Sequence, residues 1–327
     1  MTVRRIGVLT SGGDAPGMNA CIRAVVRMAD HLGIEAVGIK RGFAGLVDGD
    51  LRQLDRRAVG GIVDRAGTVL GSARLPAFLD PAIRQRAHGV LAAHGIDVLV
   101  VVGGNGSQAG AAALAAEGAA VVGVASTIDN DLAGSDTTIG FDSAVSVAIE
   151  AIDRLRATAA SHERVFLIEV MGRDSGHVAL HAAVAGGAEA FALPESPIDP
   201  DAWLAELAAT WRRKRHAIAV VAEGASPGAM ALADRLRAAR AEHGLAEISI
   251  RATVLGHLQR GATPTAADRL LATRLGAAAV RRLADGETGV LVGHDGGDVI
   301  TTPLAEVVGR RKPLDPTLLA TAAALDA

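Results

Sequence analysis

The chain has 327 residues, half of them hydrophobic and 21% charged, which excludes a disordered or collagen-like protein and leaves room for roughly two domains. The 33 basic and 36 acidic residues give a net charge of −3, and no basic block is long enough to neutralise many phosphates, so we expect no nucleic-acid partner. No apolar run approaches the about 20 residues of a membrane span, and the N-terminus has no signal-peptide pattern. We therefore expect no membrane partner and a cytoplasmic location.

Short apolar runs alternate with segments of helical periodicity along the chain, which is typical of βαβ units. The runs predict strands at 6–10, 36–39, 98–102, 121–124, 165–170, 218–222, 248–254 and 290–292. The fold class is therefore α/β with mostly parallel sheets. Asp48-Gly49, between 45–47 and Leu51, predicts an early antiparallel hairpin. Cys21 lies among apolar residues at helical spacing and is predicted to be a buried, inert thiol.

The first predicted strand leads directly into a glycine-containing turn, Thr10 to Gly17, and then into a helix. Apolar residues at 18, 21, 22, 25, 26 and 29 mark that helix. Backbone N–H groups at a helix N-terminus lack partners, which suits a phosphate. The turn is not a Walker A loop, because Met18 and Asn19 stand where Lys and Ser or Thr belong. An ordinary βα turn fits the same residues.

A second strand, 98–102, leads into Gly103-Gly104-Asn105-Gly106-Ser107 and opens another helix. Two such turns in one sheet favour a phosphorylated ligand over two unrelated tight turns. Gly104, Gly106 and Ala109 also match the dinucleotide fingerprint, but no acidic residue ends the next predicted strand. A nicotinamide-dependent enzyme is therefore a much weaker hypothesis than a protein that binds another phosphorylated ligand.

Two carboxylates, Asp129 and Asp131, follow the 121–124 strand in the segment Ser126-Thr127-Ile128-Asp129-Asn130-Asp131. Strand alternation would point both side chains the same way, toward the crevice where the carboxyl ends of parallel strands meet. One carboxylate could then accept a proton from a substrate hydroxyl while the other positions metal or substrate. A capped turn is the structural alternative.

Arginines accompany several glycine-containing segments. They are Arg74 in Gly71-Ser72-Ala73-Arg74, Arg173 in Met171-Gly172-Arg173, and Arg251 and Arg260 in the segment 251–261. The planar guanidinium matches phosphate oxygens, although a single arginine is more often a solvated surface charge. Together these side chains indicate an anionic ligand that carries more than one phosphate.

Six segments, in order, resemble the bacterial ATP-dependent 6-phosphofructokinase family: Gly-Gly-Asp-Ala-Pro-Gly-Met-Asn, Gly-Ser-Ala-Arg, Gly-Gly-x-Gly-Ser, Thr-Ile-Asp-Asn-Asp, Met-Gly-Arg and Gly-His-x-Gln-Arg-Gly. The resemblance covers nearly the whole chain. It implies two similar-sized three-layer α/β domains, with ATP bound by 1–140 plus 259–309 and sugar phosphate by 141–258 plus 310–327. It also implies transfer of the γ-phosphoryl of ATP to the 1-hydroxyl of fructose 6-phosphate, with Mg²⁺, in a homotetramer regulated by a phosphorylated effector.

The resemblance also implies residue roles. Asp129 would be the general base, Thr127 and Asp131 would support it near the transferring phosphoryl, and Arg74 and Arg173 would neutralise charge there. ATP would be held by Gly12, Arg74, Gly103, Gly104, Asn105, Gly106 and Ser107. The sugar phosphate would be held by Thr127, Asp129, Met171, Gly172, Arg173, Glu223, Arg251, His257, Arg260 and, from a neighbouring subunit, Arg164. An effector would be held by Arg23, Arg27, Arg56, Arg156, Glu189, Arg212 and Lys214.

Two positions depart from the family pattern. Asn105 stands where the family carries an Asp that is usually assigned to Mg²⁺, so the metal position offers a neutral oxygen here. Phe43 stands where a Tyr can occur, and the chain has no Tyr. The rival functions are a pyrophosphate-dependent kinase, a kinase of another ketose phosphate, and a non-catalytic sugar-phosphate or nucleotide sensor. The pyrophosphate-dependent branch characteristically has Asp at the position of Gly106 and Lys at that of Ser126, and neither occurs here.

Overall fold

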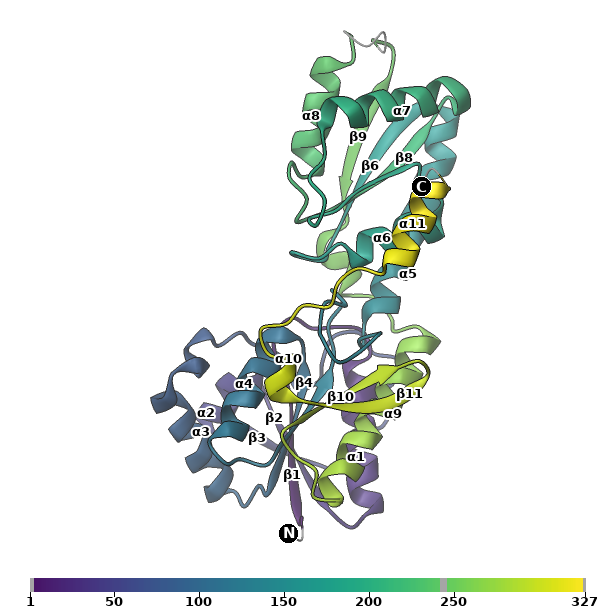
Figure 1. Ribbon diagram of the computed structural model, residues 1–327. Coiled ribbons are helices and arrows are strands. Elements are labelled where there is room, and N and C mark those ends of the chain that lie inside the picture. The colour runs from purple at the N-terminus through teal and green to yellow at the C-terminus, as the bar shows by residue number, and fades with distance from the viewer. Residues whose placement is uncertain (1–2, 242–245, 326–327) are drawn as a thin grey trace. The chain divides into compact units, whose positions relative to one another are not determined.

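The computed structural model describes residues 3–241 and 246–325, and the chain divides into two units (Figure 1). The first unit contains residues 1–143 and 260–312, and the second contains 144–259 and 313–327. The domain bounds expected from the sequence fall after residues 140, 258 and 309. The assignment of ATP to the first part and sugar phosphate to the second stays a prediction.

The first unit contains a seven-stranded sheet between two layers of helices. Its elements are β1 (Arg5–Thr10), α1 (Met18–His31), β2 (Glu35–Ile39), α2 (Gly42–Asp48), β3 (Leu51–Leu54), η1 (Pro76–Leu79), α3 (Pro81–Ala93), β4 (Val98–Gly103), α4 (Asn105–Ala116), β5 (Val121–Ala125), α9 (Ala266–Ala284), β10 (Val290–Asp295), β11 (Asp298–Pro303) and α10 (Leu304–Val307). The strand order is β11-β10-β5-β4-β1-β2-β3, parallel except for the edge strands β3 and β11. Helices α1 and α9 cover one face and α2, α3 and α4 the other (Figure 1). Because both faces are covered, β4 and β5 are buried along their whole length.

Small residues allow α1 and α9 to approach closely. A Cβ at Gly276 of α9 would lie 2.7 Å from the carbonyl oxygen of Cys21 on α1. The Cys21 thiol is buried in this contact, and burial raises its pKa to about 12. The prediction of a buried thiol is confirmed, and its chemistry is that of a small apolar side chain.

The second unit contains a four-stranded parallel sheet in the order β7-β8-β6-β9. Its elements are β6 (Arg164–Val170), α6 (His177–Gly186), β7 (Ala190–Ala192), α7 (Pro200–Lys214), β8 (Ala217–Ala222), α8 (Ala229–Ala239), β9 (Ser249–Val254), η2 (Gly256–Gln259) and α11 (Pro316–Ala324), and α5 (Phe141–Ser161) continues into it from the first unit. Trp203, Leu207 and Trp211 of α7 pack on the sheet with Val165 and Val221. The chain's two tryptophans therefore lie in this one core.

All eight predicted strands are present, whereas the predicted hairpin around Asp48-Gly49 is wrong. Residues 45–47 belong to α2, and Gly49 ends that helix with φ +70°. The spacing of Phe43, Leu46 and Val47 buries one face of a helix, so the Asp-Gly pair acts as a helix stop. The expected antiparallel excursion is instead β3, which pairs with β2 and places Leu51 opposite Ile39.

Candidate active site

Three sequence motifs meet at one edge of the first sheet because β1, β4 and β5 are neighbouring parallel strands. The register places Thr10 opposite Val102 and Val102 opposite Val124. Just beyond the strands, the Ser11 N–H donates to the Val102 carbonyl at 3.0 Å, and the Ser126 N–H donates to the Gly103 carbonyl at 3.3 Å. The two glycine loops and the aspartate loop therefore begin side by side, at the carboxyl ends where parallel sheets bind ligands.

Close approaches of the backbone explain the glycines of the second loop. A Cβ at position 103 would lie 2.5 Å from Ser107 Oγ and 2.7 Å from the Ser11 carbonyl, and a Cβ at 104 would lie 3.1 Å from Thr127 Cβ. The site thus requires these glycines for packing between loops. Gly106 is different: it is exposed, and no atom lies within 4 Å of a Cβ built there. Its surroundings are open space.

The two helices that follow the glycine loops begin differently. At α1, Gly17 is buried, and a Cβ there would lie 2.7 Å from Ile139. At α4, Gly104 is the N-cap and has no side chain to accept from the first-turn N–H groups. Asn105 is half-buried and Gly106 exposed, so the start of α4 is open to an anion. The sequence predicts a phosphate site at both helix starts. In the structure, of these two, the start of α4 is accessible and the start of α1 is buried.

The aspartate loop is a folded turn. Asn130 has φ +52°, a left-handed conformation, so Asp129 and Asp131 do not follow the strand alternation that the sequence predicts. Asn130 Nδ2 donates to the Asp136 carbonyl at 3.2 Å, and its Oδ1 accepts from the Thr138 N–H at 3.1 Å. The Thr138 hydroxyl donates to the Thr127 carbonyl at 2.6 Å. Asp129 is buried within this turn, and Asp131 is half-buried.

Arg74 is exposed and lies on a segment that is hydrogen-bonded to the first strand and glycine loop. The Ser72 hydroxyl donates to the Gly12 carbonyl at 2.6 Å, and the Thr10 hydroxyl donates to the Gly71 carbonyl at 2.9 Å. The buried Asn19 of α1 holds residues 65–69 of the same segment, because its amide donates to the Arg65 carbonyl and accepts from the Val69 N–H. Asn19 is the last residue of the motif Gly-Gly-Asp-Ala-Pro-Gly-Met-Asn, and this role is not predicted from the sequence.

Two polar side chains, the exposed Glu223 and the buried Gln259, shape the Met-Gly-Arg turn of the second unit. Glu223 Oε1 accepts from the Arg173 N–H at 2.6 Å and from the Gly172 N–H at 3.3 Å. Gln259, fully buried, accepts from the Met171 N–H at 2.7 Å and donates to the Ala144 carbonyl at 3.0 Å. Arg173 has φ +54° and is exposed. One oxygen of Glu223 thus shapes the turn, and the expected contact of this side chain with the sugar phosphate stays a prediction. The role of Gln259 was missed.

The remaining expected sugar-phosphate residues are spread over both units. Arg251, on the edge strand β9, and His257, in η2, have exposed side chains in the second unit, and Arg164 begins β6. Arg260 is different. It is buried in the first unit, and its guanidinium donates to the Asp14 carbonyl at 2.8 Å. Arg260 therefore supports the first glycine loop.

The expected effector residues form one group in each unit. Arg23, Arg27 and Arg56 belong to the first, where burial, and then the neighbouring guanidinium groups of Arg27 and Arg56, lower the pKa of Arg23. In the second unit the buried Glu189 accepts from Lys214 at 3.1 Å and from Arg156 at 3.4 Å. Arg212 lies in the last turn of α7, close to Lys214 in sequence.

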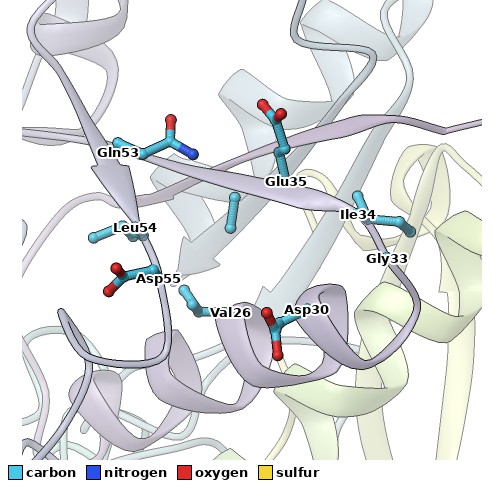
Figure 2. A pocket seen from close by; sticks show the side chains of 9 residues that line it. Val26, Asp30, Gly33, Ile34, Glu35, Gln53, Leu54 and Asp55 are labelled. Atoms are coloured by element: carbon cyan, nitrogen blue, oxygen red, sulfur yellow. The ribbon is translucent and has the colours of Figure 1, made fainter.

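Figure 2 shows a pocket of the first unit. Its lining includes Asp30 of α1, Glu35 at the start of β2, and Asp55 just after β3. Because Glu35 begins β2, the pocket lies at the amino edge of the parallel strands, opposite the glycine loops. Arg56 donates to Asp30 at 3.0 Å, which joins the pocket to the arginine group.

Phe43 is part of the core. Its ring stacks on that of Phe78 with centroids 4.0 Å apart, both residues are buried, and a Cβ at Gly110 would lie 2.7 Å from the Phe43 ring. Position 43 therefore offers no exposed aromatic ring to a nucleoside. Within residues 3–241 and 246–325, no group of three His, Cys, Asp or Glu side chains is arranged to hold a metal ion, and no helix is long and apolar enough to cross a membrane.

The chain is similar to known proteins over almost its whole length. The profile of the family described as Phosphofructokinase matches residues 5–283. ATP-dependent 6-phosphofructokinase 1 of Thermus thermophilus is 56% identical over 319 residues, covering 97% of this chain and 98% of the relative. ATP-dependent 6-phosphofructokinase 1 of Clostridium perfringens is 45% identical over 325 residues, covering 99% of this chain and 100% of the relative.

Solved structures extend the comparison. Phosphofructokinase from Pichia pastoris in the T-state has a TM-score of 0.86 at 34% identity, over 100% of this chain and 37% of that one. A pyrophosphate-dependent phosphofructokinase from Nitrosospira multiformis has a TM-score of 0.88 at 21% identity, over 96% of this chain and 86% of that one, a likeness of fold alone. The family profile, the full-length relatives and the loops described above agree: the chain belongs to the phosphofructokinase family.

Proposed function

We propose that the protein is an ATP-dependent 6-phosphofructokinase of glycolysis, which transfers the γ-phosphoryl of ATP to the 1-hydroxyl of fructose 6-phosphate. The products are fructose 1,6-bisphosphate and ADP. The observation that carries the proposal is the meeting of Gly12, the Gly103–Ser107 loop and the Thr127–Asp131 loop at one edge of a parallel sheet, in a chain of this family. A nucleotide-binding surface and a buried carboxylate are then neighbours.

ATP binds to the first unit in this proposal. The open start of α4 offers backbone N–H groups and a positive helix end to the phosphates, with Ser107 and the glycines of both loops around them. Arg74 is held beside the first glycine loop and supplies a fixed cation. Because the phosphoryl-transfer transition state spreads negative charge over its oxygens, placed donors and cations perform most of the catalysis.

Asp129 takes the proton of the acceptor hydroxyl as that oxygen attacks the γ-phosphorus. A positioned general base contributes about 10²–10⁴-fold to the rate. Its carboxylate is buried in a turn that Asn130 and Thr138 hold in place, which limits its freedom before the reaction. Thr127 and Asp131 flank it and support the same phosphoryl group.

The sugar phosphate binds to Arg173, Arg251 and His257 of the second unit, whose exposed side chains suit an anion. Glu223 and Gln259 hold the backbone of the turn that presents Arg173, with Met171 and Gly172. We assign Arg164 to the same ligand from a neighbouring subunit of a homotetramer. Arg260 contributes by fixing the first glycine loop through Asp14.

Mg²⁺ fits this site as the companion of ATP. Asn105 is half-buried at the open start of α4 and offers one neutral amide oxygen. Mg²⁺ is commonly held by few protein ligands together with substrate phosphates and water. When bound, the ion neutralises charge on the phosphates. Asn105 is the residue of this chain that we place beside it.

We also propose regulation by a phosphorylated effector in the cytoplasm. Arg23, Arg27 and Arg56 form a cationic group, and Glu189 orients Lys214 and Arg156 in the other unit, with Arg212 on the same helix as Lys214. A nucleoside diphosphate or a phosphorylated acid carries the charge that such arginines bind.

A coupled assay of the purified protein with ATP or pyrophosphate, across several ketose phosphates, tests the function. We expect turnover with ATP and fructose 6-phosphate, and none with pyrophosphate. Gly106→Asp is the sharpest variant, because position 106 faces open space and the substitution leaves the fold unstrained, while its carboxylate repels the phosphates of ATP. Its KM for ATP should rise about tenfold or more. Comparable wild-type turnover with pyrophosphate would overturn the donor assignment.

A further inference from the structure

Lys312 is one of only three lysines in the chain, and it is the last residue of the first unit before the chain enters the second. Its half-buried ammonium donates to the Asp136 carbonyl at 2.6 Å and to the Ser135 carbonyl at 3.0 Å. Its backbone N–H donates to the Asp131 carbonyl at 2.9 Å. Lys312 thus contacts the segment 131–136 at three points.

The neighbouring residues extend this contact. Arg311 forms an antiparallel β-bridge with Leu132, whose side chain is fully buried in the core of the first unit. The segment 311–312 therefore lies along residues 131–132 like a short added strand. The loop is anchored on one side by the core and on the other by the segment that leaves the unit.

The Asp136 carbonyl connects Lys312 to the buried carboxylate. This oxygen accepts from the Lys312 ammonium and also from Asn130 Nδ2, at 3.2 Å. Asn130 follows Asp129 directly and holds the left-handed backbone of the turn. A carbonyl has two acceptor sites, so both donors are accommodated. Removal of the ammonium takes one donor from the Asp136 carbonyl and leaves Asn130 as the other, while the Asp136 N–H still donates to the His294 carbonyl at 2.7 Å.

We propose that Lys312 is a positioning residue for phosphoryl transfer: it holds the 131–136 segment so that the turn carrying Asp129 keeps its reactive geometry. The inference rests on the function proposed above and adds a residue that no motif contains. The side chains of Asp131 and Asp136 both favour the charged amine, whereas burial, the larger effect, lowers the pKa of Lys312 to about 8. At neutral pH the amine is thus charged and donates to two carbonyls.

Steady-state kinetics of Lys312→Met test the proposal, because this unbranched side chain is only one atom shorter than lysine and cannot donate. We expect kcat to fall about tenfold, since displacement of reacting groups by about 1 Å can cost up to 10²-fold, while the KM for ATP changes less than about twofold. Lys312→Arg keeps the charge and the donors and should recover kcat to within about threefold. Lys40→Met, at an exposed lysine paired with Asp50, is the matched control.

Hydrogen exchange of the amides of residues 126–138 provides a readout that does not depend on turnover. Exchange should accelerate in Lys312→Met and stay near wild type in Lys312→Arg. If Lys312→Met unfolds below the assay temperature, Lys312→Gln, which keeps one amide donor group, is measured by the same criteria. Unchanged kcat and exchange in the neutral variant would overturn the inference, as would equal losses in the arginine variant. A wild-type protein without kinase activity would refute the proposed function instead. Hydrogen exchange of residues 126–138 would then still show whether Lys312 holds this segment.

Discussion

The two units build the turns that we propose to face their ligands in different ways. In the first unit, three loops follow adjacent parallel strands, and the strand register alone places Gly103 and Ser126 beside each other. In the second unit, the turn at Met171 is shaped by Glu223 and Gln259, which lie 51 and 88 positions away from their partners in the chain. The first arrangement relies on backbone and small residues, and the second relies on long polar side chains.

This difference determines how each site should respond to substitution. The start of a loop that strand register places keeps its position when a side chain at that start is shortened, so a change there affects the chemistry that the side chain performs. A turn held by a buried side chain shifts when that side chain is replaced, because backbone N–H and carbonyl groups lose their partners. The predictions below separate these two behaviours.

The largest effect is expected at Asp129. Asp129→Ser should lower kcat by about 10²–10⁴-fold and leave the affinity for fructose 6-phosphate within about twofold, because the proposed general base is lost and the loop stays anchored by Asn130 and Thr138. Initial rates and equilibrium binding of the sugar phosphate measure the two quantities. Asp285→Ser, at an exposed position after α9, is the control. A variant that keeps most of its turnover would reduce Asp129 to a turn-forming residue.

An intermediate effect is expected at Gln259. Gln259→Leu leaves the Met171 N–H and the Ala144 carbonyl without their partner, at a cost of about 1–3 kcal/mol of unfolding free energy. The displaced turn should raise the KM for fructose 6-phosphate about tenfold while the KM for ATP stays within about twofold. Denaturant unfolding and steady-state kinetics measure these changes, with Gln85→Leu on the exposed face of α3 as the control. An equal rise in both KM values would contradict the division of ligands between the units.

The smallest effect is expected at Asn105. Asn105→Asp should lower the Mg²⁺ concentration for half-maximal rate by about two- to fivefold, because a carboxylate binds the ion more tightly than an amide while phosphates and water supply most ligands. Calorimetric titration of ATP with and without Mg²⁺ provides a readout besides activity. Ala116→Asp, which adds the same charge at the far end of α4, is the control. A large loss of activity in Asn105→Asp would mean that the amide N–H₂ donates to a phosphate oxygen.

Periodicity and local chemistry were sufficient to predict much of the fold. The apolar runs predict eight strands, seven of them central and the eighth the edge strand β9, because a buried parallel strand must be apolar along its length. They miss β3, β7 and β11, of which β7 has only three residues and β3 and β11 are partly exposed edges. The Asp-Gly pair at 48–49 was misread because the same two residues suit a hairpin turn and a helix end, and only the burial of Phe43, Leu46 and Val47 decides between them.

For the site, residue types and motif order sufficed to predict which residues carry the chemistry, and those roles stay predictions. Glycines, carboxylates and arginines at strand ends have this property because their function is local and depends on residue type. The folded chain was needed to see that α4 rather than α1 presents an open helix start, and that Gln259 and Lys312 hold turns remote from them in sequence. These roles depend on which carbonyl or N–H lies within about 3 Å, a distance that the folded backbone sets and residue type does not.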